Sequence, residues 1–190
     1  MLTFAIGLVV LQSKIKPVMG RELPLSALGK KLEAAAKQRG WSRLHDRTLP
    51  QGNVSKVDPN FVLSRYAYGN HVFSFNVEVA KSLTEAKREL RMALRSNAMS
   101  PRTKIEEPLL KGTGLQLDVA DFSNKRISNM KAYSTMSMRI TGAIKRAVVI
   151  IYVDMPSAVP VSNDKPKPDE QIYNDVVALA KLVAKEIKKS

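Results

Sequence analysis

One stretch in the middle of the chain constrains the fold more than any other. Residues 72–80 carry an apolar side chain at every second position: Phe73, Phe75, Val77 and Val79. A period of two is typical of a strand with one buried face. Ser82-Leu83-Thr84-Glu85 follows at once and has the pattern of a capping box, with Ser82 as N-cap. The sequence therefore predicts a strand that leads directly into a helix ending near Asn97.

Further strands are expected on both sides of this unit. Phe61–Ala67 precedes it, and the intervening Gly69-Asn70 predicts the tight turn of a hairpin. Residues 112–120 and 133–141 alternate again, and Gly142 after them predicts a turn. Residues 147–153 are continuously apolar, which indicates a central strand covered on both faces.

Two more helices complete the prediction. Apolar side chains at three- and four-residue spacing indicate a helix over residues 25–39, and Gly40 suits its C-terminal end. Residues 169–188 show the same spacing, with an acidic start and a basic end that agree with the helix dipole. The order of elements predicts an α+β fold: an antiparallel sheet of about five to six strands, covered by two or three helices, with a long C-terminal helix.

The length of 190 residues fits one domain of ordinary size. We expect a single α+β domain over residues 61–190, with a helix and an irregular connection over residues 14–60 packed on it. Leu2–Leu11 is almost wholly apolar but too short to span a bilayer. Its length matches the core of a signal peptide, so residues 1–13 are interpreted as a leader and the protein as exported to a periplasm or to the outside. The alternatives are a buried strand or helix of a cytoplasmic protein, and an anchor that lies at a membrane interface.

Charge is the strongest compositional signal, because the formal net charge is +14. Residues 81–146 carry 14 Lys and Arg against 6 Asp and Glu, whereas residues 147–190 carry 6 of each. A basic surface favours anionic partners such as lipid headgroups, acidic proteins or nucleic acid. The competing interpretation is a scattered surface charge that only keeps the protein soluble.

The middle segment also supplies the candidate site residues. Lys87, Arg91 and Arg95 stand at four-residue spacing on the helix after Ser82, and basic residues continue into the next loop. The anion-binding candidates are Lys87, Arg88, Arg91, Arg95, Arg102 and Lys104.

Motifs for catalysis or for cofactors do not stand out. The chain has no cysteine, which excludes disulfides, thiolate zinc sites and iron–sulfur clusters. Its two histidines are His45, beside Asp46, and His71 at the hairpin turn. Neither has a flanking nucleophile motif, so we expect no cofactor, no metal and no enzyme activity.

The sequence also resembles the PsbP-like domains over about residues 61–190. The resemblance lies in the element order, in the hairpin that enters a capped helix (Val72–Asn97), and in the glycine-led strand Gly112-Thr113-Gly114-Leu115-Gln116-Leu117. The Pro-x-Gly-Trp that such domains usually show is missing, and Trp41 follows a helix instead. The resemblance implies an accessory or binding role in an envelope or organelle lumen.

Two functions follow as hypotheses. The first is a non-enzymatic, exported or envelope-associated binding domain whose partner is a protein, a lipid headgroup or another anionic molecule. The second is an intracellular protein that binds nucleic acid through its basic surface. No transmembrane span is expected in either case.

Overall fold

The computed structural model describes residues 25–44, 60–69, 71–96, 102–121, 136–153 and 169–190. The helices in these ranges are α1 (Leu25–Gln38), α2 (Leu83–Ser96), α3 (Asp169–Lys189) and a short 3-10 helix, η1 (Pro108–Leu110). The strands are β1 (Ser42–Arg43), β2 (Phe61–Tyr68), β3 (His71–Val79), β4 (Thr103–Ile105), β5 (Leu115–Asp121), β6 (Met136–Ile144) and β7 (Ala147–Val153). The predicted leader, residues 1–13, lies outside the described residues.

The strands form one antiparallel sheet in the order β1-β2-β3-β7-β6-β5-β4. This confirms the predicted α+β class and the long C-terminal helix, but the sheet has seven strands and not five to six. The two extra strands are the edges β1 and β4, which are two and three residues long. Such short strands are specified by pairing with a neighbour and are too brief to show a period of two.

The turn predicted at Gly142 is wrong. Strand β6 runs through Gly142 to Ile144, and the chain reverses at Lys145, whose φ is 53°. Gly142 pairs with Leu115 of β5, and its missing side chain leaves room for the backbone of Gly114. Gly142 therefore allows β5 and β6 to approach each other closely, and it does not form a turn.

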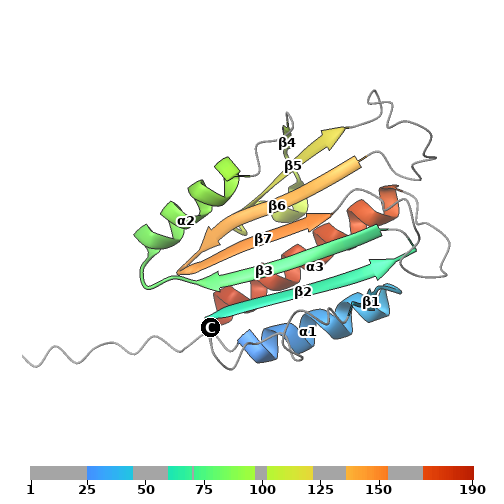
Figure 1. Cartoon of the computed structure of the whole chain (residues 1–190), viewed down its shortest axis with the longest axis horizontal. Helices are drawn as coiled ribbons and strands as arrows, with labels where there is room; N and C mark the ends of the chain where they lie inside the picture. The colour runs from blue at the N-terminus through green and yellow to red at the C-terminus, as the bar shows by residue number, and fades with distance from the viewer. Residues whose placement is uncertain (1–24, 45–59, 70, 97–101, 122–135, 154–168) are drawn as a thin grey trace, which may run out of the picture.

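Helices cover both faces of the sheet (Figure 1). Helices α1 and α3 pack on one face, where they bury the main core, and α2 packs on the other face against β6 and β7. Strand β7 serves both cores, because Val149 and Ile151 face α3 whereas Val148 packs with Ala86 of α2. Its continuous apolar sequence is explained by this double burial, as predicted.

Trp41 ties the N-terminal helix to the rest of the fold. Its side chain is 1 % exposed, and its Nε1 donates a hydrogen bond to Oδ2 of Asp175 in α3 at 2.9 Å. The indole ring lies edge-on to Phe73 at 5.0 Å between centroids, and the ring of Tyr66 stacks on Phe73 at 4.8 Å. Burial raises the pKa of Tyr66 to about 12. The polar contact and the aromatic contacts together hold the 25–43 segment against β2, β3 and α3.

Within the described ranges, no helix combines the length and the apolar character that a membrane crossing requires.

Candidate anion-binding surface

Helix α2 forms where the capping pattern predicts it. The N–H of Glu85 donates to Oγ of Ser82 at 3.1 Å, and Oε2 of Glu85 accepts from the N–H of Lys81 at 2.8 Å. Ala86 is fully buried against Val148 and Ala80, with Leu90 partly buried beside it. These contacts fix which side of the helix faces the sheet and which side faces outward.

Four cationic side chains occupy the outward side of α2. Lys87, Arg88, Arg91 and Arg95 are all exposed, and we call them the α2 cationic face. At 1.5 Å per residue they span about 12 Å of the helix. Among the described residues none of the four forms an ion pair, although Nε of Arg91 donates to the carbonyl of Lys87 at 3.3 Å. The structure thus brings together four of the six predicted residues.

The carboxylates of α2 do not balance this face. Glu85 closes the first turn as part of the cap. Glu89 is only partly exposed, and its Oε2 is buried without a hydrogen-bond partner. Beside the cations, the apolar side chains of Met92 and Leu83 are 53 % and 46 % exposed. The outward side of the helix is therefore positively charged, with two apolar side chains at its border.

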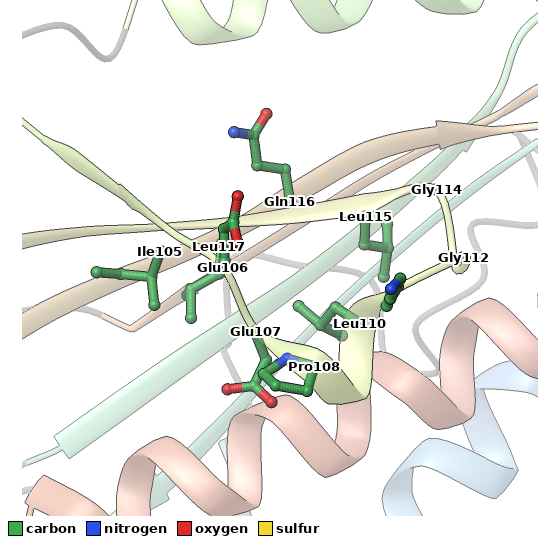
Figure 2. Close-up of a pocket in the computed structure, with 11 residues that line it drawn as sticks. Ile105, Glu106, Glu107, Pro108, Leu110, Gly112, Gly114, Leu115, Gln116 and Leu117 are labelled. Carbon is green, nitrogen blue, oxygen red and sulfur yellow. The ribbon is translucent and has the colours of Figure 1, made fainter.

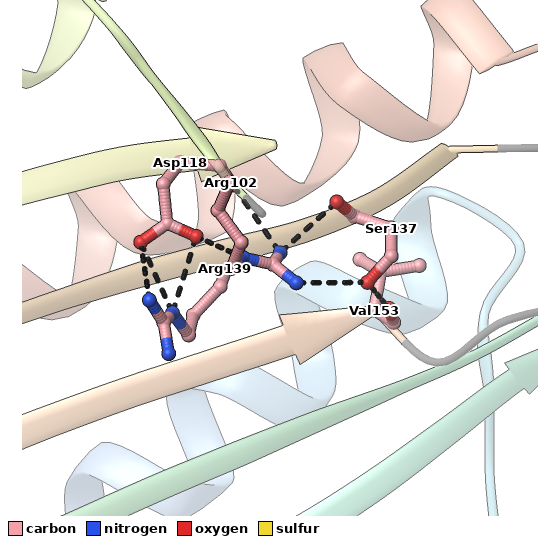
Figure 3. Close-up of polar contacts among 5 residues, drawn as sticks. All are labelled: Arg102, Asp118, Ser137, Arg139 and Val153. Atoms are coloured by element: carbon pink, nitrogen blue, oxygen red, sulfur yellow. Dashed lines mark hydrogen bonds and ion pairs between the residues drawn. The ribbon is translucent and has the colours of Figure 1, made fainter. Parts of the chain in front are cut away.

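Arg102 lies in a different environment from the α2 cationic face. It forms an ion pair with Asp118, and its Nη2 donates to the carbonyl of Ser137 at 3.0 Å (Figure 3). Its guanidinium also lies 5.8 Å from the ring centroid of Tyr152, within cation–π range. Only 10 % of the Arg102 side chain is exposed, so its charge is directed to the sheet and not to solvent.

Asp118 joins Arg102 to a second arginine, Arg139 (Figure 3). Nη2 of Arg139 lies 2.8 Å from Oδ2 of Asp118, and Nε lies 3.0 Å from the same oxygen. The Asp118 and Arg139 side chains are 11 % and 10 % exposed. We call these three residues the Asp118 cluster; it carries a net charge of +1, and Nη1 of Arg139 is buried with no hydrogen-bond partner.

Lys104, the last predicted residue, is exposed on edge strand β4 and stands opposite Asp118 in the register. Asp118 and Arg139 themselves were not predicted from the sequence. Each is one charged residue in an alternating strand, which is usual for a residue facing solvent. Only the pairing of β4, β5 and β6 makes them neighbours.

A second feature near β4 is an open pocket of about 820 Å³. The chain leaves the sheet after Ile105, forms η1, and returns at Leu115, and the pocket lies within this excursion (Figure 2). Leu115 and Gln116 point to opposite sides of β5, with Leu110 beneath Leu115 (Figure 2). The apolar side of the pocket is therefore continuous with the core.

The carboxylates of this pocket do not form an acid–base pair. Glu107 caps η1, because its Oε1 accepts from the N–H of Leu109 at 3.0 Å, and its Oε2 accepts from the hydroxyl of Tyr173. Burial, and then the contact with Glu107, raise the pKa of Tyr173 to about 12. The side chain of Glu106 is exposed to solvent. Glu107 thus has a structural role and Glu106 is solvated, so these two carboxylates of the pocket do not form a pair that could transfer a proton.

The histidines do not converge on a site in the described part of the chain. His71 is 1 % exposed and opens strand β3, and His45 with Asp46 falls outside the described residues. No group of three or more His, Asp or Glu side chains suited to a metal ion occurs in the ranges that the structure describes. The α2 cationic face is the strongest candidate for contact with a partner.

The chain matches no protein-family model, no curated protein and no solved structure.

Proposed function

We propose that this protein is a non-catalytic binding domain of the cell envelope that docks on anionic lipid headgroups through the α2 cationic face. The observation that carries the proposal is the geometry of α2. Its four cations are exposed in one row, and neither of its glutamates neutralises them. Lys and Arg side chains beside an anionic membrane surface contribute about 1 kcal/mol each.

The packing of α2 on the sheet also favours binding at the membrane surface over insertion into the bilayer. Its apolar side is occupied by the sheet through Ala86 and Leu90, so that side is not free to enter the acyl region. Contact is then mainly electrostatic, with Leu83 and Met92 as the apolar side chains nearest the interface. Binding of this kind is reversible and weakens as salt screens the charges.

The variant Arg88→Glu/Arg91→Glu tests this function. We expect its affinity for vesicles of phosphatidylcholine and phosphatidylglycerol to fall at least about 30-fold, since two attractions of about 1 kcal/mol each are lost and repulsion is added. Co-sedimentation at low salt measures the loss, with vesicles of phosphatidylcholine alone as the background.

The matched control is Lys30→Glu/Lys37→Glu, which makes the same charge change on exposed positions of α1, on the opposite face of the sheet. It should retain most of the binding. Equal loss in both variants would show that net charge alone attracts the protein, which contradicts the proposal. A native protein that fails to bind anionic vesicles but binds duplex DNA, with loss of DNA binding in Arg88→Glu/Arg91→Glu, is a second contradicting outcome. In that case the partner is nucleic acid.

Export is a separate part of the proposal and has its own test. For protein isolated from its native cells, we expect an intact mass that lacks about the first dozen residues, because the apolar run Leu2–Leu11 has the length of a signal-peptide core. The mass should be found in an exported or envelope fraction. A full-length product in the cytosol would contradict this and favour the nucleic-acid alternative.

A further inference from the structure

The edge of the sheet beside β5 has a gap that the course of the chain creates. Strand β4 pairs with β5 from Thr103 to Ile105, and Ile105 stands opposite Leu117. Leu115 and Gln116 pair with β6 on one side, and no described strand pairs with them on the other. The chain instead leaves the sheet toward α3, forms η1 and then returns to β5. The pocket of about 820 Å³ lies in this gap (Figure 2).

Both walls of the pocket are fixed by contacts within the fold. One wall is β5, which is paired with β6 along its length. The other wall contains η1, which Glu107 holds in place by accepting hydrogen bonds from the N–H of Leu109 and from the hydroxyl of Tyr173 in α3. At the far end, Oγ1 of Thr113 donates to the carbonyl of Leu110 at 2.6 Å. Because these walls are already ordered, a ligand does not have to order them when it binds.

The floor of the pocket is apolar. It is lined by Leu110, Leu115 and Leu117, which belong to the main core and are 4 %, 8 % and 1 % exposed. Ile105 lines one end and is 38 % exposed. A ligand that covers Ile105 removes apolar surface from water, which is favourable in proportion to the area buried. The volume of the pocket is within the range of sites for small molecules.

The charge of the pocket is opposite in sign to that of the whole chain. Its lining contains two carboxylates, Glu106 and Glu107, and one ammonium, Lys111, which give a formal net charge of −1 in a chain of +14. Neutral groups bind Glu107, so its charge is not cancelled. Glu106 is exposed and forms no ion pair with a described residue. It lies at the Ile105 end of the pocket, whereas Lys111 precedes Gly112 at the other end (Figure 2).

We infer that this pocket binds a small organic cation, namely an amine that carries an apolar chain. The chain packs on the leucines of the floor and covers Ile105, and the ammonium pairs with the carboxylate of Glu106. A chain of +14 attracts anions in general, so a preference for a cation at this place requires a specific site. The pocket contains no residue of the α2 cationic face, and the inference does not depend on lipid docking.

NMR titration of the 15N-labelled full-length protein with n-hexylammonium tests the inference at the pocket itself. We expect saturable shifts of the backbone amides of Leu110, Gly114 and Gln116, which line the pocket. The anion n-hexanoate has a chain of similar length and should bind there at least about threefold more weakly, since repulsion from Glu106 replaces an ion pair. n-Propylammonium has a shorter chain to bury and should bind at least about fivefold more weakly than n-hexylammonium.

The variant Glu106→Gln separates binding at the pocket from a general charge effect. It removes the charge at nearly constant size, so we expect the affinity for n-hexylammonium to fall about threefold. Glu33→Gln makes the same charge change on α1, which packs near the opposite edge of the sheet, and should leave the affinity nearly unchanged. Thermal unfolding checks that both variants are folded.

Three results would each overturn the inference. They are an absence of shifts at the pocket amides with n-hexylammonium, equal or tighter binding of n-hexanoate at the same amides, and equal weakening by Glu106→Gln and Glu33→Gln. None of them bears on the proposed lipid docking, which the vesicle assay with Arg88→Glu/Arg91→Glu tests separately.

Discussion

Replacing Asp118 by alanine is expected to lower the free energy of unfolding by about 3–5 kcal/mol, because two nearly buried guanidinium groups lose their shared carboxylate. Arg139 forms two short contacts with Asp118, at 2.8 and 3.0 Å, and Arg102 binds its other oxygen. Without Asp118 these two like charges remain close together with little access to water. For a chain of this size the melting temperature should fall by roughly 10 °C, as measured by circular dichroism.

Glu33→Ala provides the control for this prediction. Glu33 pairs with Arg43 at 2.8 Å, a distance equal to that between Asp118 and Arg139, but its side chain is 43 % exposed. An exposed pair contributes about 0–1 kcal/mol, so this variant should be nearly as stable as the native protein. If Asp118→Ala costs no more than Glu33→Ala, the Asp118 cluster does not need its carboxylate and our account of it is wrong.

Gly142→Ala is expected to have the second large effect, with a loss of about 3 kcal/mol or more. A Cβ at Gly142 would lie 2.2 Å from the carbonyl oxygen of Gly114 and 3.0 Å from its carbonyl carbon. Both atoms belong to the backbone, so no change of rotamer relieves the clash, and β5 must move away from β6. Overpacking of this kind typically costs 1–3 kcal/mol, and more where the backbone itself is displaced. Denaturation in urea measures the loss.

Gly112→Ala is the matched comparison for Gly142→Ala. Gly112 has a positive φ of 71°, but a Cβ there would meet nothing within 4 Å. Alanine at this position therefore carries only the strain of the left-handed conformation, about 1–2 kcal/mol. A result in which Gly112→Ala is the more damaging of the two would mean that β5 and β6 tolerate separation at Gly142.

The α2 cationic face and the exposed lysines of α1 lie on opposite faces of the sheet. On α2, the cations are mostly arginines on a convex helix, which suits contact with many headgroups at once. The variant Lys30→Glu/Lys37→Glu on α1 is the control for the α2 variant, so a general attraction of a +14 protein to anions is separated from a specific site.

The PsbP-like resemblance stays a prediction. The accessory role in an envelope or lumen that it implies is part of the proposed function.

Local patterns predicted the elements well. The capping box at Ser82 and the alternation of residues 72–80 correspond to α2 and β3, because caps and side-chain periods depend on residues close together in the chain. The continuous apolar run of β7 also indicated burial on both faces. Edge strands β1 and β4 were not predicted, because two or three residues are too few to show the alternation of apolar and polar side chains that identifies a strand.

The candidate sites were predicted only in part. The α2 cationic face follows from helical spacing, so the sequence by itself determines that Lys87, Arg91 and Arg95 lie on one side. Arg102 appeared to extend that face, yet the structure pairs it with Asp118, 16 residues away. This ion pair depends on the register of β4 and β5, which local sequence does not encode.

The lysines toward the end of α3 show most clearly what only the tertiary structure decided. Residues 147–190 are neutral by count, with 6 basic and 6 acidic residues. Helix α3 places Asp175 near its start, where Trp41 engages it, and collects four lysines toward its end. The sheet then brings Lys145 to the same end. Net charge is a property of the sequence, whereas the field at a surface depends on distances between charges, and folding alone sets those distances.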